Sequence, residues 1–123
     1  MTRGPAAAIL LLLTVIATTP VSAVVSPSGI DPRLRLEWES GQDRSGHPVI
    51  TGYIYNDYSR MAINVRLLAE TLDASGQVVD RAFGFVPGNV PVSNRNFFRV
   101  PLHATGAAYR VTVTSFEWRD CGI

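Results

Sequence analysis

Residues 61–72 read MAINVRLLAETL, and whether this stretch forms a helix or a strand decides the fold class. Its Ala, Leu and Glu residues favour a helix, whereas apolar residues at every second position favour a half-buried strand. Ile63, Val65 and Leu67 follow the period of two, and the adjacent Leu67 and Leu68 dilute any helical apolar face. The pattern predicts a strand, and with it an all-β protein.

The residues that follow predict a hairpin. In DASG (73–76), Asp73 can cap its own turn through its carboxylate, and Gly76 can adopt a positive φ at no steric cost. We therefore expect an antiparallel hairpin between a strand that ends at Leu72 and a strand that begins at Gln77.

Five further segments show the alternation that is typical of half-buried strands. It is clear in LRLEWE and YRVTVT, where apolar residues alternate with charged or polar ones, and weaker in VVDRAFGF, where Arg81 shares a side with Phe83 and Phe85. The segments are residues 34–39, 50–55, 78–85, 97–102 and 109–114. Turn-forming residues separate them at the spacing expected of a sandwich.

Six strands, or seven at most, without a helix to cover them must bury their apolar sides against one another. The sequence therefore predicts an all-β fold, a two-sheet antiparallel immunoglobulin-like β-sandwich of 6–7 strands. We expect this domain to span residues 34–123, after a proline-containing extended leader at residues 24–33.

The first 23 residues have the three-part layout of a secretory signal peptide. Arg3 precedes an apolar run at residues 6–17, and Pro20 and Ala23 end the segment. The run is shorter than the ~20 residues that a membrane-spanning helix needs. We expect cleavage after Ala23 and a periplasmic or secreted protein that meets the membrane only through its signal peptide; an uncleaved anchor is the alternative.

Charge argues against a nucleic-acid partner. The chain has 11 basic and 10 acidic residues, and all the basic ones are arginines spread singly along the sequence. Binding to nucleic acid depends on a concentrated positive field that displaces counterions from phosphates. We therefore expect no nucleic-acid binding.

The order of motifs resembles a known family. A strand with the pattern Gly-x-apolar-x-Asn (Gly52, Ile54, Asn56) precedes the hairpin D-x-x-G-x-V-V, the aromatic strand NFFRV and the final YRVTV. Over residues 34–118 this order resembles the bacterial FxLYD-type domain, a small secreted immunoglobulin-like β-sandwich. Residues 69–73 (AETLD) correspond to the naming motif and keep its final Asp. The resemblance implies an extracytoplasmic adhesion or interaction module without catalytic residues.

The sequence offers little for catalysis. His47 and His103 lie in loop-like segments, and no spacing of His or Cys matches a zinc or copper site. We therefore expect no enzymatic activity, no cofactor and no metal. Two alternatives involve Cys121, the single cysteine: a thiol- or metal-dependent activity with a histidine that the fold brings near, and a covalent homodimer through an intermolecular disulfide.

Binding is the remaining class of function. Tyr53 and Tyr55 point away from the side of Ile54, so they face outward in the predicted strand. If residues 61–72 pair with that strand through the NDYSR turn, Arg66 and Glu70 share this outer face. Tyr and Arg are enriched at protein interfaces, so we expect the patch to bind an envelope protein or a glycan. The alternative is that the tyrosines only stabilise the sheet.

Phe116 and Trp118 form a second binding candidate near the C-terminus. Both are out of phase with Val111 and Val113 of the same predicted strand. Either a β-bulge turns them toward the core, or they form an exposed aromatic pair that anchors a partner.

Overall fold

The computed structural model describes residues 24–27 and 31–120, so the expected signal peptide (1–23) and Cys121 lie outside the described residues. Every regular element of the described part is a strand, and none of its segments is a helix that could cross a membrane. The strands are β1 (Val24–Pro27), β2 (Leu34–Gln42), β3 (Pro48–Asn56), β4 (Met61–Leu72), β5 (Val78–Phe85), β6 (Asn89–Val90), β7 (Arg95–Pro101) and β8 (Ala108–Arg119).

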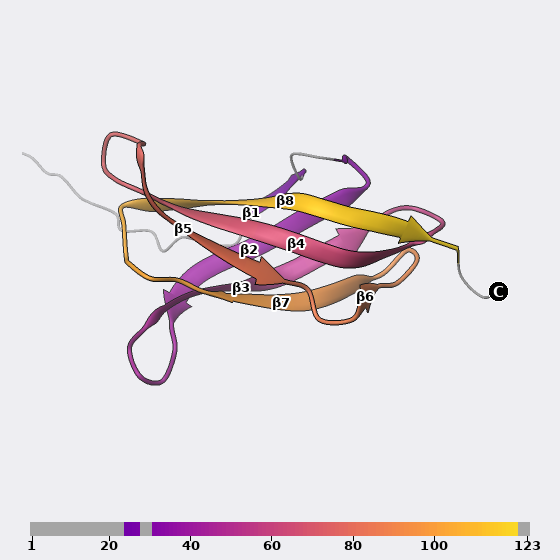
Figure 1. The fold of residues 1–123 in the computed structure, drawn as a ribbon, viewed down its shortest axis with the longest axis horizontal. Coiled ribbons are helices and arrows are strands. Elements are labelled where there is room, and N and C mark those ends of the chain that lie inside the picture. Colours follow the sequence, from indigo (N-terminus) through magenta and orange to yellow (C-terminus); the bar gives the residue numbers. More distant parts are fainter. Residues whose placement is uncertain (1–23, 28–30, 121–123) are drawn as a thin grey trace, which may run out of the picture.

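The strands form two antiparallel sheets. Sheet A has the order β1-β2-β3-β7; in sheet B, β4 is central, with β8 on one side and β5 and β6 in succession on the other. The sheets lie on each other, and their strands cross at an angle (Figure 1). The predicted all-β sandwich is confirmed, and the six predicted strands are all present. The short β1 and β6 are additional, and β1 lies within the segment expected as an extended leader.

The connections between the sheets give the sandwich its immunoglobulin-like topology. β3 and β4 follow each other in the chain but lie in opposite sheets, and so do β7 and β8. β3 pairs with β7, and β4 pairs with β8. Strands B, C, E and F of immunoglobulin domains are related in the same way.

The core lies between the inner faces of the two sheets. Its residues are those that the alternation places on one side of each strand, with Trp38 and Tyr109 at its margin. Burying each large apolar side chain stabilises the fold by about 1.5–3 kcal/mol. The larger fully buried apolar side chains are Leu34, Leu36, Ile50, Ile54, Val65, Leu67, Val90, Phe98, Val100 and Val113.

β5 is the exception, because its large apolar residues face solvent. Phe83 and Phe85 expose 69% and 61% of their surface, whereas Ala82 and Gly84 face the core. The reason is the close approach to β7: a Cβ on Gly84 would lie 2.8 Å from the side chain of Val100. The inner side of β5 therefore accepts only small residues.

A β-bulge shifts the alternation of β4 and β8 at matching positions. In β4 the buried positions pass from Ala62 to Val65, and the intervening Asn64 has a φ of 53°. In β8 the shift turns Phe116 and Trp118 toward the core, against which both pack. An extra residue in one strand rotates the following side chains to the other face, so the bulge alternative is the one observed.

Residues 43–47 and 73–77 form the same hairpin turn. In each, the Asp carboxylate accepts the N–H groups of the residues two and four positions later, at 2.8–2.9 Å. The glycine three positions after the Asp has a φ of 83° in the first turn and 87° in the second. The hairpin expected after Leu72 is confirmed, and DRSGH repeats its chemistry between β2 and β3.

The close approach of β2 to β3 predicts that adding a single methyl group at Gly52 destabilises the fold. Gly52 lies opposite Trp38, and a Cβ on Gly52 would collide with the carbonyl oxygen of Glu37 and lie 2.7 Å from the Trp38 Cα. Backbone atoms cannot move aside cheaply, so Gly52→Ala should lower the free energy of unfolding by about 3 kcal/mol in urea titration. Gly41→Ala, whose Cβ meets nothing within 4 Å, should have little effect. Equal losses would contradict this explanation.

The second turn predicts a pH dependence. Two hydrogen bonds hold the pKa of Asp73 below its usual 3.8. The larger effect comes from the backbone N–H of Gln77, and the next from the Ser75 side chain. A carboxyl whose pKa is lower in the folded state contributes stability above its unfolded pKa and loses it as the pH falls through the folded pKa. Asp73→Asn should therefore lower the melting temperature at neutral pH, with a difference from wild type that shrinks below pH about 4. Melting curves across this range test it; a constant difference would refute it.

Candidate functional site

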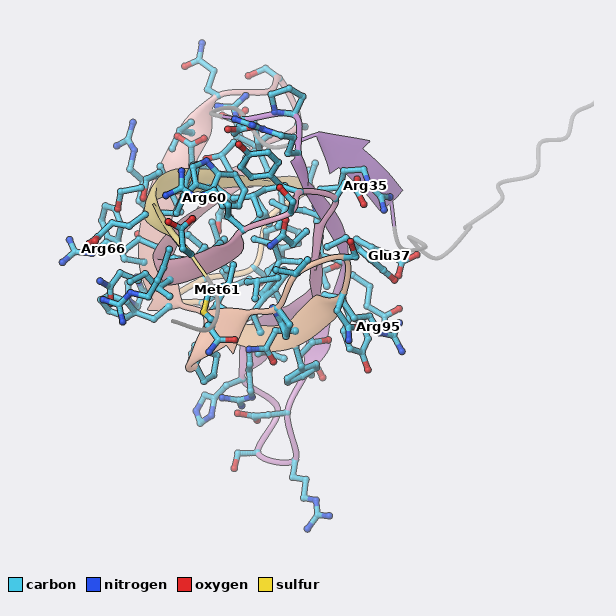
Figure 2. The ribbon with its side chains drawn as sticks, turned by 90° about the vertical axis from the view of Figure 1, so that its right-hand side faces the viewer. Arg35, Glu37, Arg60, Met61, Arg66 and Arg95 are labelled. Atoms are coloured by element: carbon cyan, nitrogen blue, oxygen red, sulfur yellow. The ribbon has the colours of Figure 1, made fainter. Side chains whose placement is uncertain are left out.

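The outer face of sheet A carries a cluster of aromatic and charged side chains, which we call the tyrosine face. Three adjacent strands place its residues in two rows across the sheet. The rows are Arg35–Tyr55–Arg95 and Glu37–Tyr53–Phe97, each with one residue from β2, β3 and β7. Figure 2 shows Arg35, Glu37 and Arg95 together along one side of the molecule.

The aromatic rings of the tyrosine face contact one another and the arginines. The Tyr53 ring meets Phe97 edge-on, with 5.7 Å between centroids, and lies 6.5 Å from Tyr55. The Arg95 guanidinium lies 4.1 Å from the Tyr53 centroid, and Arg35 lies 4.9 Å from that of Tyr55. At these distances a guanidinium is attracted to the face of an aromatic ring.

Hydrogen bonds hold the Tyr55 hydroxyl in place. It donates to Glu37 Oε1 at 2.8 Å and accepts from Arg95 Nη1 at 3.3 Å. The bond to Tyr55 raises the pKa of Arg95. On the other side, Asp57 accepts two hydrogen bonds from Arg35, which raise the pKa of Arg35 and lower that of Asp57. Both tyrosines are half-buried, so the side chains have defined orientations before any partner arrives.

A shallow hollow of about 250 Å³ adjoins the Glu37–Tyr53–Phe97 row. Its lining combines the aromatic rings of Tyr53 and Phe97 with the carboxylates of Glu37 and Glu39 and the hydroxyl of Thr51. The hollow thus offers an apolar surface together with hydrogen-bond acceptors.

Arg66 and Glu70 do not belong to the tyrosine face, so the expectation that they join Tyr53 and Tyr55 is wrong. β3 pairs with β2 and β7, whereas β4 lies in sheet B. The chain between β3 and β4 crosses from one sheet to the other instead of turning back within a sheet. Figure 2 accordingly shows Arg66 on the side away from Glu37.

On sheet B these two residues have partners of their own. Glu70 lies between Arg110, at 2.8 Å, and Arg81, at 3.5 Å. The Arg66 guanidinium lies 5.3 Å from the ring centroid of Phe85.

Sequence reasoning did not place Arg35, Glu37, Arg95 and Phe97 beside the two tyrosines. The alternation already put Arg35, Glu37 and Phe97 on the outer sides of their strands. It could not show which strands are neighbours, and that knowledge is needed to bring the residues together.

Phe116 and Trp118 close one end of the sandwich. Their rings meet at 5.0 Å, and Trp118 also meets Tyr58 edge-on at 4.7 Å. The Arg33 guanidinium lies 4.0 Å from the Tyr58 centroid and 5.2 Å from that of Trp118. Phe116 and Trp118 pack against the core, so their first role is to cover apolar side chains.

Each histidine lies near the carboxylate of an aspartate. His47 Nδ1 lies 3.6 Å from Asp43, and His103 Nδ1 lies 3.4 Å from Asp80. Within residues 31–120, no group of three or more His, Cys, Asp or Glu could hold a metal ion. Because Cys121 lies outside the described residues, its thiol activity and its disulfide stay predictions.

The fold and the site define a class of protein: an immunoglobulin-like β-sandwich with an ordered aromatic and charged outer face. No family model fits the chain, and neither a curated protein nor a solved structure matches it significantly.

The packing of Trp118 predicts that its main effect is on stability. Trp118→Ala should lower the free energy of unfolding by about 3 kcal/mol, because it uncovers the end of the core. Tyr53→Ser should cost at most about 1 kcal/mol, as expected for a cross-strand pair on the outside of a sheet. Urea unfolding of both variants measures the difference, and similar losses would contradict it.

Proposed function

We propose that the chain is a secreted or periplasmic, non-catalytic module that binds a protein of the cell envelope through the tyrosine face. The observation that carries this proposal is the fixed arrangement of Tyr53 and Tyr55 with Arg35, Glu37 and Arg95 on one exposed sheet surface.

The residue types and the restrained orientations of their side chains both favour protein binding. Tyr and Arg provide the largest share of binding energy at many interfaces. Ordering side chains on binding costs free energy, about 0.5–1.5 kcal/mol for each mobile side chain. Contacts with Glu37 and Arg95 already restrain Tyr55, so much of this cost is met in the free protein.

Two sequence features support the proposed location. The layout of residues 1–23 is that of a signal peptide. The motif order over residues 34–118 resembles the FxLYD-type domain, whose members are secreted interaction modules.

A glycan is the second candidate ligand, favoured by the hollow beside Tyr53 and Phe97. A sugar ring presents C–H groups that pack on aromatic rings and hydroxyls that donate to carboxylates. Glu37 and Glu39 supply such acceptors at this place.

The test is site-specific photo-crosslinking in the native cell. A photoreactive phenylalanine analogue at position 97 should form a defined protein adduct. Tyr53→Ser/Tyr55→Ser should abolish it, while lowering the melting temperature less than Trp118→Ala does. The matched control, Arg110→Ser/Thr112→Ala on the outer face of sheet B, should keep the adduct.

Three outcomes would contradict the proposed protein partner. One is an adduct that survives the double tyrosine substitution, and another is a melting temperature that falls as far as it does in Trp118→Ala. The third is binding of envelope oligosaccharide fragments, seen as NMR shift changes confined to the hollow, without any protein adduct; this result favours the glycan.

A further inference from the structure

An apolar patch lies on the opposite side of the molecule from the tyrosine face. Val79, Phe83 and Phe85 of β5 expose 57%, 69% and 61% of their surface. They alternate along one strand, with Arg81 between them. Scattered apolar residues on a surface are ordinary, whereas several large ones exposed on the same face of one strand indicate an interaction site.

β5 is also an open edge of sheet B, since β4 is its only hydrogen-bonded neighbour among the described strands. The Arg81 N–H donates to the Asp80 carboxylate at 2.8 Å, and the Val86 N–H donates to Val65 of β4 at 3.0 Å. Backbone groups alternate in direction along an antiparallel strand. Residues 81, 83 and 85 therefore turn both their backbone groups toward the open edge and their side chains toward solvent.

The neighbouring edge of sheet A is blocked at more of its N–H positions than the edge of β5, because side chains accept the N–H groups of Arg95 and Phe97 and Pro101 has no N–H. In β7, the Asn96 carboxamide accepts the Phe97 N–H at 2.8 Å and donates to the carbonyls of Pro87 and Asn89 at 2.7 and 2.8 Å. Proteins commonly block exposed edges in such ways because open edges pair with other strands. On β5 only the Arg81 N–H has such a block.

The pattern of β5 is complementary to a second copy of itself in antiparallel orientation. With the two-fold axis at Ala82, Phe83 of one copy lies beside Arg81 of the other, and Phe85 lies beside Val79, the residue at which β5 has a β-bulge. Aromatic pairs with β-branched residues and with guanidinium groups both stabilise such contacts. With the axis at Arg81, two like charges would face each other, which is unfavourable.

We propose that the chain forms a non-covalent homodimer in which β5 pairs antiparallel with β5 of a second copy, about Ala82. The two copies of sheet B then form one continuous sheet. A two-fold axis perpendicular to that sheet turns both tyrosine faces to the same side. The dimer is therefore bivalent toward any partner that the tyrosine face binds, and bivalence strengthens binding without new contacts.

The first test is the molecular mass in solution. Sedimentation equilibrium of the purified chain, with a reductant to keep Cys121 from forming a disulfide, should show a monomer–dimer equilibrium with a dissociation constant on the order of 10 μM, typical of small interfaces. Phe83→Ser/Phe85→Ser should raise this constant at least about tenfold. Phe97→Ser, which removes an exposed ring from sheet A, should leave it unchanged, and all variants should keep the wild-type circular dichroism spectrum.

A charge-swap experiment tests the register. Val79→Lys and Phe85→Glu should each weaken the dimer, whereas the double variant should restore it, because each new lysine then faces the glutamate of the second copy. A monomer at every concentration, or a dimer unchanged by Phe83→Ser/Phe85→Ser, overturns the proposal. A double variant no stronger than the single ones overturns the register about Ala82.

Discussion

The side chain of Asn56 holds the crossing between the two sheets, and the arrangement of the sandwich depends on it. Buried at the end of β3, its carboxamide donates to the carbonyls of Arg60 and Val90 at 2.8 and 3.1 Å and accepts the Tyr58 N–H at 2.8 Å. These bonds shape the link to β4 and tie β6 of sheet B to β3 of sheet A. A buried polar group without partners costs about 1–3 kcal/mol, so losing these bonds while Asn56 stays buried would destabilise the crossing.

Because the chain crosses at this point, the molecule has two different outer surfaces. The tyrosine face lies on sheet A, where β2, β3 and β7 align aromatic rings with arginines and a carboxylate. The apolar row of β5 lies on sheet B, at an edge that only β4 covers. The first surface combines aromatic rings and charged groups that internal contacts hold in place, and the second carries exposed apolar side chains beside an open strand edge. This division underlies both proposals, partner binding through the tyrosine face and self-pairing through β5.

Local patterns were enough to predict most of the elements. The alternation in LRLEWE and YRVTVT predicts strands because side chains of a strand point to opposite faces in turn, and both are strands. The DASG hairpin follows from the hydrogen bonds of one Asp and the positive φ of one Gly. β1 and β6 were missed because two to four residues are too few to show a period. The sequence could not show which side of β5 faces the core, because that depends on the space between Gly84 and Val100, residues from different sheets.

The sequence by itself determined the strands, the turns and the outward direction of Tyr53 and Tyr55, since these properties depend on neighbouring residues. Only the tertiary structure decided that Arg35 and Arg95 flank Tyr55 and that Arg66 and Glu70 lie on the other sheet. The physical reason is that strand pairing is non-local. An alternating strand satisfies its own pattern beside any partner, and the choice among partners rests on core packing and on the buried hydrogen bonds at the crossing.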